Sequence, residues 1–187
     1  MMLVGKYLRV LLATTHLAIK DVPAQLTTEK IYGMIRLAHN SLRRDFGIEN
    51  PDIAVLALNP HSGENGLFGD EESGIIKPAI AKARANKITV SGPYPADTLF
   101  PRVENHFDCV VCMYHDQGLI PLKLLAFGSG VNITLGLPIV RTSVDHGTGY
   151  DIVGKNIAHY GSLVEAVKLA QTIALSRHRR AGYTPRR

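Results

Sequence analysis

The chain lacks any apolar run long enough to span a lipid bilayer, and its N-terminus lacks the layout of a signal peptide. We therefore expect no membrane partner and a cytoplasmic location. The chain has 187 residues, of which 45% are hydrophobic and 20% are charged, values typical of a soluble globular protein. This length fits one α/β domain, or one domain plus part of a second.

Cysteine is scarce, which excludes a disulfide-stapled fold. Cys109 and Cys112 form a C-x-x-C pattern that is typical of redox or zinc sites on loops and helix starts. Here the pattern lies inside an apparent strand, where residues three apart point to opposite faces. We expect two buried, reduced thiols in place of a shared site.

An excess of one charge is also missing from most of the chain. The net charge of +5 comes from the C-terminus, because five of the 21 basic residues are arginines among the last eleven residues, leaving 16 basic and 16 acidic residues elsewhere. We therefore expect no nucleic-acid partner. The basic residues predict a solvated helix end, favourable to the helix dipole, followed by a frayed terminus.

Three histidines each follow a short apolar run that has the length of a buried strand. His16 closes the run 8–15, His61 closes 53–60 and His115 closes 109–114. In an alternating strand–helix chain the strands run parallel, so residues just beyond them gather along one edge of the sheet. Three imidazoles there could bind a divalent metal ion and leave one position open. Asp116 could support His115, act as a base, or cap the next helix.

The remaining elements follow from apolar periodicity and turn residues. Further strands are predicted over 88–90, 131–135 and 139–142, and helices from 27 or 28 to 47, and over 70–85, 98–100 and 119–127. A last helix is predicted over 162–179, opened by a capping box of Ser162 and Glu165. Its expected apolar stripe consists of Leu163, Val167, Ala170 and Ala174.

A cationic and polar set lies within otherwise apolar sequence: Lys123, Asn132 and Arg141. A buried cation needs an anionic partner, and a phosphate or carboxylate ligand would supply one. An internal ion pair with Asp97 or Asp145 is the alternative. The polar loop 145–154 has a Gly-Thr-Gly backbone that could wrap a nucleotide, which is weak evidence by itself.

Five ordered strings carry a specific resemblance: TTHLAIKDVP, LALNPHSGENGLFG, GPYPADTLF, MYHDQGLIPLK and FGSGVNITLGLPIVRTSVDHGT. Together they resemble the 4-hydroxythreonine-4-phosphate dehydrogenases of the pyridoxal-phosphate pathway, over about residues 1–176. The resemblance implies a three-layer α/β/α fold with a mixed sheet, like that of isocitrate and isopropylmalate dehydrogenases. It also implies a homodimer whose active sites lie at the subunit interface.

Members of this family are much longer, so the resemblance implies that most of a first domain is absent here. Residues 1–160 would form the metal- and substrate-binding second domain. Residues 161–187 would form the C-terminal helix of the first domain and its basic tail. The alternative is a truncated, non-catalytic metal-binding domain of the same family.

The resemblance also implies residue roles. His16, His61 and His115 would hold a divalent metal ion (zinc, cobalt or magnesium), with His115 from the partner subunit, and Lys123, Asn132 and Arg141 would bind a small phosphorylated substrate. Asp145, His146, Gly147 and Asp151 would contact NAD. Asp116, Asp97 and Lys123 are the catalytic candidates. The expected reaction oxidises 4-phosphohydroxy-L-threonine to a β-keto acid that loses carbon dioxide. Threonate or erythronate 4-phosphate are alternative substrates, and a zinc hydrolase is a further alternative.

Overall fold

A seven-stranded mixed sheet forms the middle of the molecule. The computed structural model describes residues 1–103, 106–126 and 128–180. The sheet has the strand order β4-β3-β5-β2-β1-β6-β7. Its strands are β1 (Met2–Val4), β2 (Arg9–Leu12), β3 (Ile53–Leu56), β4 (Val90–Tyr94), β5 (Cys109–Cys112), β6 (Val131–Ile133) and β7 (Thr142–Val144). Strands β4, β3, β5 and β2 run parallel, whereas β1, β6 and β7 pair antiparallel to their neighbours.

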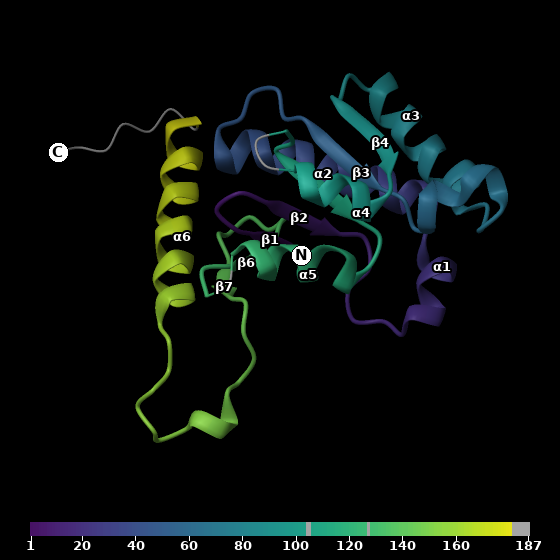
Figure 1. Ribbon diagram of the computed structural model, residues 1–187. Helices are drawn as coiled ribbons and strands as arrows, with labels where there is room; N and C mark the ends of the chain where they lie inside the picture. Colours follow the sequence, from purple (N-terminus) through teal and green to yellow (C-terminus); the bar gives the residue numbers. More distant parts are fainter. Residues whose placement is uncertain (104–105, 127, 181–187) are drawn as a thin grey trace.

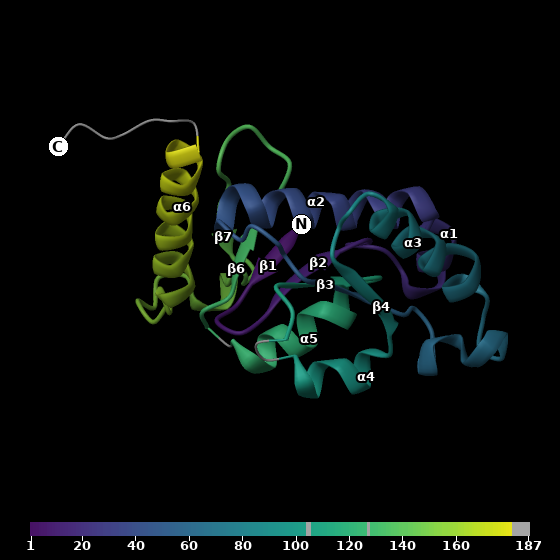
Figure 2. The same cartoon turned by 90° about the horizontal axis from the view of Figure 1, so that it is seen from above.

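Helices cover both faces of this sheet, as Figures 1 and 2 show. The helices are α1 (Val22–Gln25), α2 (Thr28–Phe46), α3 (Lys77–Ala85), α4 (Ala96–Leu99), α5 (His115–Leu125) and α6 (Gly161–Arg180). In Figure 2, α2 and α3 lie above the sheet and α4 and α5 below it. The predicted three-layer α/β/α fold with a mixed sheet is therefore confirmed. Within the described part of the chain, none of the helices combines the length and hydrophobicity that a membrane span requires.

Short helical turns complete the connections. Their bounds are Ile19–Asp21, Pro60–Gly66, Glu72–Ile76, Phe100–Arg102 and Tyr150–Ile152, of which Glu72–Ile76 is a π-helical turn that leads into α3. The predicted ends of α2 are confirmed. The Thr27 hydroxyl accepts a hydrogen bond from the Lys30 amide at 3.1 Å, and Gly47 closes the helix with a φ of 73°.

Two apolar cores lie on the two faces of the sheet. One contains residues of α2, α3 and α6, and the other contains residues of α4 and α5. Cys109 belongs to the first core and Cys112 to the second, and neither forms a disulfide. The prediction that the two thiols point to opposite faces is therefore confirmed, which excludes a shared redox or metal site.

Several elements differ from the sequence prediction. Strand β1 was not expected, because three residues are too few to show a period. Strand β4 begins at Val90, the last residue of the predicted strand 88–90, and continues to Tyr94 because it pairs with β3. Helix α5 begins at His115, four residues before its predicted start. Strand β7 begins at Thr142, at the end of the predicted strand 139–142, because pairing with β6 sets its bounds.

Helix α6 buries a different face from the predicted stripe. Ser162, Ala166 and Ile173 are buried, whereas Leu163 and Val167 are exposed. The capping box is also wrong, since the Ser162 hydroxyl lies inside the helix and donates to the Gly130 carbonyl at 2.7 Å. Helical periodicity predicts an apolar face, but the packing of α6 on α2, β6 and β7 decides which face is covered.

The basic end of α6 was predicted to be a solvated helix end, but two of its arginines form ion pairs with other parts of the chain. Arg177 donates to both carboxylate oxygens of the fully buried Asp45, at 2.7 and 3.2 Å. Its guanidinium also donates to the Pro138 carbonyl at 3.1 Å, and Arg180 pairs with Glu49. The predicted frayed terminus, residues 181–187, lies outside the described residues.

Candidate functional site

The carboxyl ends of β2, β3 and β5 meet at one edge of the sheet, where buried polar groups join them. The Thr14 hydroxyl donates to the Met113 carbonyl at 2.7 Å. The side chain of Gln117 accepts from the Met113 amide at 2.7 Å and donates to the Ala57 carbonyl at 2.7 Å. These bonds fix the three loops that carry His16, His61 and His115. The sequence reasoning missed Gln117, because it stands between Asp116 and Gly118, where nothing local marks it as buried.

His16 and His115 come together at this edge. Their ring centroids lie 5.4 Å apart, and both residues line a cavity of about 240 Å³. Thr15, Tyr114 and Asp116 line the same cavity. The structure therefore confirms that the ends of β2 and β5 bring two of the three predicted imidazoles into one place.

Asp116 orients the ring of His115. Its Oδ1 atom lies 2.6 Å from Nδ1 of His115, so Nε2 is the ring nitrogen left for a ligand. A carboxylate that holds one ring nitrogen is the usual support for a metal-binding histidine. The predicted capping role of Asp116 is wrong, because Tyr114 occupies the cap position of α5.

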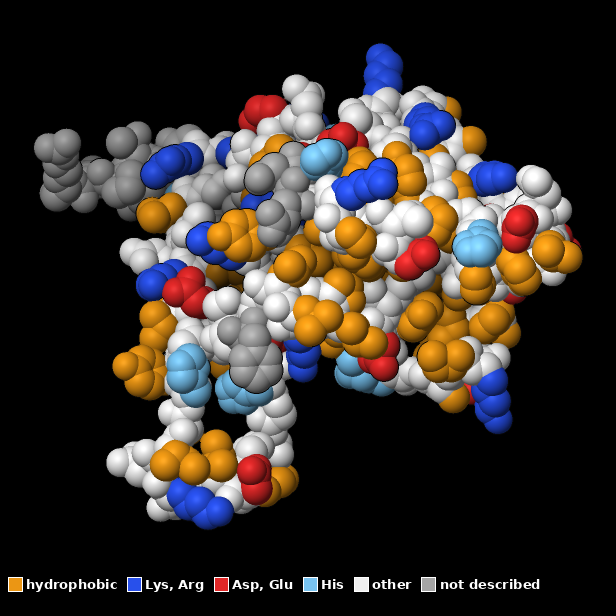
Figure 3. Space-filling model, viewed as in Figure 1, with side chains coloured by type: hydrophobic (Ala, Val, Ile, Leu, Met, Phe, Trp, Pro, Cys, Tyr) orange, Lys and Arg blue, Asp and Glu red, His pale blue; other side chains and the backbone are white. Residues whose placement is uncertain are grey.

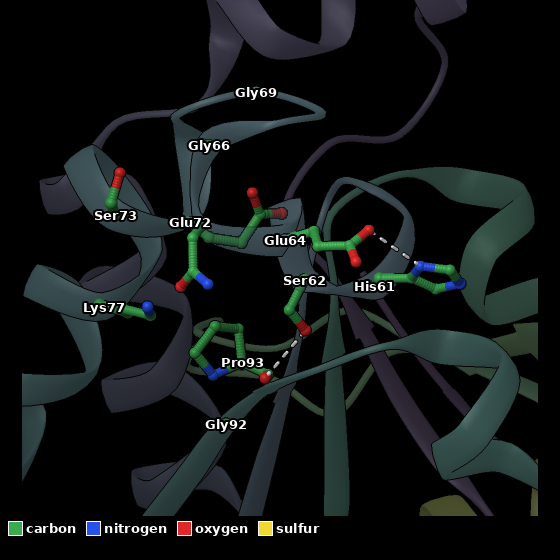
Figure 4. A pocket seen from close by; sticks show the side chains of 11 residues that line it. His61, Ser62, Glu64, Gly66, Gly69, Glu72, Ser73, Lys77, Gly92 and Pro93 are labelled. Carbon is green, nitrogen blue, oxygen red and sulfur yellow. Dashed lines mark hydrogen bonds and ion pairs between the residues drawn. The ribbon is translucent and has the colours of Figure 1, made fainter.

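His61 lies apart from this pair, on the turn Pro60–Gly66 after β3. Its Nδ1 atom is 3.4 Å from Oε2 of Glu64, and its ring meets that of Phe68 edge-on at 6.0 Å. Figure 4 shows His61 and Lys77 on opposite sides of a second cavity of about 800 Å³. Among the described residues of one chain, no three histidine, cysteine, aspartate or glutamate side chains are grouped closely enough to hold a metal ion.

Lys123 lies with the predicted cofactor residues. It lines a cavity of about 500 Å³ together with Asp145, His146 and Gly147. The Asp145 amide donates to the Ser162 hydroxyl at 3.3 Å, which fixes the loop at the start of α6. Nδ1 of His146 lies 2.9 Å from the Gly147 carbonyl oxygen. The structure thus places Lys123, a substrate-binding candidate, in the same cavity as three of the cofactor-binding candidates.

The other two members of the cationic set lie elsewhere. Arg141 is exposed and donates to the Thr134 hydroxyl at 2.7 Å, and Asn132 is on β6. The Asn132 side-chain oxygen is buried and has no hydrogen-bond partner among the described residues, which fits a group that accepts a hydrogen bond from a ligand. Neither residue lines the cavity that contains Lys123.

Two predicted acidic residues, Asp97 and Asp151, are exposed and do not line the cavity of the histidine pair. Asp97 lies in the first turn of α4, and Asp151 lies in the short helix Tyr150–Ile152. That short helix is at the tip of a long loop that projects from the body in Figure 1. Figure 3 shows apolar side chains gathered on this tip, where Tyr150 is 82% exposed.

Comparisons with known proteins identify the family. The model of the pyridoxal phosphate biosynthetic protein PdxA family matches residues 1–170. This chain belongs to that family. A 4-hydroxythreonine-4-phosphate dehydrogenase from Geobacter metallireducens is 57% identical over 175 residues, covering 93% of this chain and 51% of the relative. One from Desulforapulum autotrophicum is 56% identical over 171 residues, covering 91% and 50%.

Solved structures of similar proteins have the same fold. The crystal structure of 4-hydroxythreonine-4-phosphate dehydrogenase from Klebsiella pneumoniae matches with a TM-score of 0.82 and 46% identity, over 92% of this chain and 53% of that one. A terephthalate 1,2-cis-dihydrodiol dehydrogenase from Burkholderia xenovorans matches with a TM-score of 0.75 and 37% identity, over 91% and 54%. The chain spans about half the length of the relatives it matches.

Proposed function

We propose that this chain carries the metal- and substrate-binding half of an NAD-dependent dehydrogenase that oxidises 4-phosphohydroxy-L-threonine in pyridoxal 5'-phosphate biosynthesis. The observation that supports this most directly is the pairing of His16 and His115 at the carboxyl ends of parallel strands. Ligands of open α/β sheets bind at that edge. Membership in the pyridoxal phosphate biosynthetic family supports the choice of substrate.

The residues at this edge fit a divalent metal ion. Two imidazoles 5.4 Å apart, one with a carboxylate on its second nitrogen, are the donors that zinc and cobalt prefer. One chain groups only part of the set, so we assign the site to His16, His61 and His115 with at least one ligand from a second subunit. When bound there, the ion would lower the pKa of a substrate hydroxyl and polarise the carbonyl that forms.

The other residues of the chain bind the substrate and move a proton. Lys123, Asn132 and Arg141 would hold the phosphate and fix its position. The substrate hydroxyl would give its proton to a carboxylate as hydride leaves for NAD, and we favour Asp116 for this role because it adjoins His115. Asp97 is the second candidate. The β-keto acid would then lose its carboxyl group as carbon dioxide.

The loop around Asp145 would receive NAD. Its cavity is lined by apolar side chains such as Ile152, which suit an adenine ring. His146 and Gly147 line the same cavity, and Asp151 follows them on the loop.

Exposed apolar residues on the helix that begins at His115 support a homodimer. Helix α5 begins at His115 and presents Ile120 and Leu124 to the surface, and Leu124 is 80% exposed. Large apolar side chains exposed together mark an interaction surface. A second copy packed on α5 would bring its own site residues close to His115. We propose that neither a nucleic acid nor a membrane is a partner of this chain.

Metal binding tests the proposal directly. Cobalt titration of the full chain, followed by calorimetry, is expected to show binding that His16→Ala and His115→Ala each abolish. His178→Ala, in the last turn of α6, is the control and is expected to bind as the wild type does. Unchanged cobalt binding in both site variants would refute the metal assignment.

Activity is tested by NADH formation from 4-phosphohydroxy-L-threonine with zinc, cobalt or magnesium present. NADH formation from threonate or erythronate 4-phosphate instead would assign the related substrate. That alternative is worth testing because a relative with another dehydrogenase name shares the fold. Metal binding without NADH formation would support the non-catalytic alternative for this chain.

A further inference from the structure

We infer that Glu72 is a positioning residue that holds His61 in place by fixing the backbone at the carboxyl end of β3. The inference rests on the proposed role of His61 as a metal ligand. Glu72 lies in the π-helical turn before α3, eleven residues from His61, and is only 2% exposed. Its carboxylate touches the two residues that directly precede the turn carrying His61.

The contacts of Glu72 account for both of its carboxylate oxygens. Oε1 accepts from the Leu58 amide and from the Asn59 amide, each at 2.8 Å. Oε2 accepts from the Asn59 side-chain amide at 3.0 Å. Asn59 is also bonded to Glu71 at 2.7 Å. Charge-assisted bonds to successive backbone amides fix the direction in which the chain leaves β3.

That direction matters because the next residues adopt an uncommon backbone. Six consecutive residues, 61–66, have positive φ values, and only two of them are glycine. His61 itself has a φ of 51°. Left-handed conformations at non-glycine residues persist only where the surrounding structure imposes them. Glu72 supplies buried contacts that hold this turn in its left-handed conformation.

Two glycines show how closely the turn fits around the carboxylate. A Cβ atom at Gly63 would lie 2.6 Å from Oε2 of Glu72, and one at Gly69 would lie 2.6 Å from the Asn59 side-chain nitrogen. Gly63 is buried in the turn. The turn therefore packs directly on Glu72 and cannot shift independently of it.

The ring of His61 has little else to hold it. Among the described residues it contacts Glu64 and Phe68, which belong to the same exposed loop. The Ser62 hydroxyl donates to the Pro93 carbonyl at 3.2 Å, which ties the turn to β4. The position of His61 therefore depends on its backbone, and the backbone depends on Glu72.

The test compares Glu72→Gln with a buried carboxylate elsewhere. Asp45→Asn is the matched control, because Asp45 is also fully buried and fully hydrogen-bonded but lies on α2. Amide hydrogen exchange, followed by NMR, reports on Leu58 and Asn59, and the His61 ring signals report on the turn. Cobalt titration reports on the site, and the cobalt absorption spectrum reports on its geometry.

For Glu72→Gln we expect exchange at Leu58 and Asn59 at least tenfold faster, a shifted His61 ring signal, and cobalt binding weakened about 10- to 100-fold. Asp45→Asn should change none of these, although it should lower overall stability. Asn59→Ala removes the side-chain hydrogen bond to Oε2 of Glu72 at a position with ordinary backbone angles, and it should reproduce part of these effects, which covers the case in which Glu72→Gln does not fold.

The outcomes separate this inference from the proposed function. Unchanged exchange and His61 signals in a folded Glu72→Gln variant would overturn the inference, as would equal changes in Asp45→Asn. If the wild type binds no cobalt, the metal assignment fails, whereas the exchange and His61 signals still decide whether Glu72 positions the turn.

Discussion

The contact between α6 and α2 offers a quantitative test, because it depends on one buried carboxylate. Asp45 is fully buried near the end of α2 and accepts hydrogen bonds from Arg44 at 2.7 and 3.0 Å and from Arg177 at 2.7 and 3.2 Å. Arg177 lies 132 residues away on α6. Asp45→Asn keeps the size of the side chain and removes its charge, so it isolates this interaction.

The two arginines contribute unequally to the expected loss. The side chain of Arg44 is 42% exposed, so its pair with Asp45 contributes about 0–1 kcal/mol. The side chain of Arg177 is only 18% exposed, and hydrogen bonds to a charged group contribute about 1.5–3 kcal/mol. We expect Asp45→Asn to lower the free energy of unfolding by about 2–3 kcal/mol, a fall in Tm of roughly 4–12 °C.

The effect should depend on pH in a defined direction. Burial alone would raise the pKa of Asp45, but the hydrogen bonds and charges of Arg44 and Arg177 outweigh burial and lower it. A lowered pKa in the folded state adds stability above the unfolded value of about 3.9, and this stability is lost as pH falls through the folded pKa. The difference between wild type and Asp45→Asn should therefore narrow below about pH 4.

Urea unfolding followed by circular dichroism, at pH 7 and at steps down to pH 3, measures both effects. Glu29→Gln is the control, because it removes a carboxylate charge from an exposed pair with Lys82 and should change stability by less than about 1 kcal/mol. A loss for Asp45→Asn no larger than that of the control, or a difference that stays constant with pH, would refute the reasoning.

Three further predictions concern the core and the joined strand ends. Burial raises the pKa of Cys109 to about 12 and that of Cys112 well above its ordinary value, so a disulfide reagent should modify neither thiol until the protein is unfolded; rapid modification of the folded protein would contradict this. Gln117→Leu should lower the free energy of unfolding by about 2–4 kcal/mol, because it leaves two backbone groups without their partner; a urea titration measures it, and a loss under 1 kcal/mol would count against the contact. Gly118→Ala should lower it by about 1–3 kcal/mol in the same assay, because the added Cβ would lie 2.9 Å from Sγ of Cys112; a neutral result would show that α5 can move away from the sheet.

Much of the fold could be predicted from local patterns. The apolar runs before the histidines predicted β2, β3 and β5, because parallel buried strands are apolar on both faces. The caps of α2 at Thr27 and Gly47 followed from residue type alone. The opposite orientation of Cys109 and Cys112 followed from the twofold period of a strand.

The candidate site could be predicted only in part. The sequence predicted that histidines following parallel strands gather at one edge of the sheet, whereas the pairing of His16 with His115 in one chain depends on β2 and β5 being neighbours. The position of His61 was not predictable, because its turn adopts six consecutive positive φ values that depend on Glu72. Glu72 lies near the start of the helix predicted over 70–85, and nothing local marks it as buried.

Residue type and spacing thus determined which segments become strands and helices, since those choices depend on neighbours a few positions away along the chain. Tertiary structure alone decided which face of α6 is covered, that Arg177 meets Asp45, and that Glu72 supports the turn of His61. Each of these depends on groups brought together from distant or separately folded segments. Burial gives such contacts their strength, because a charged group removed from water must find its partners within the fold.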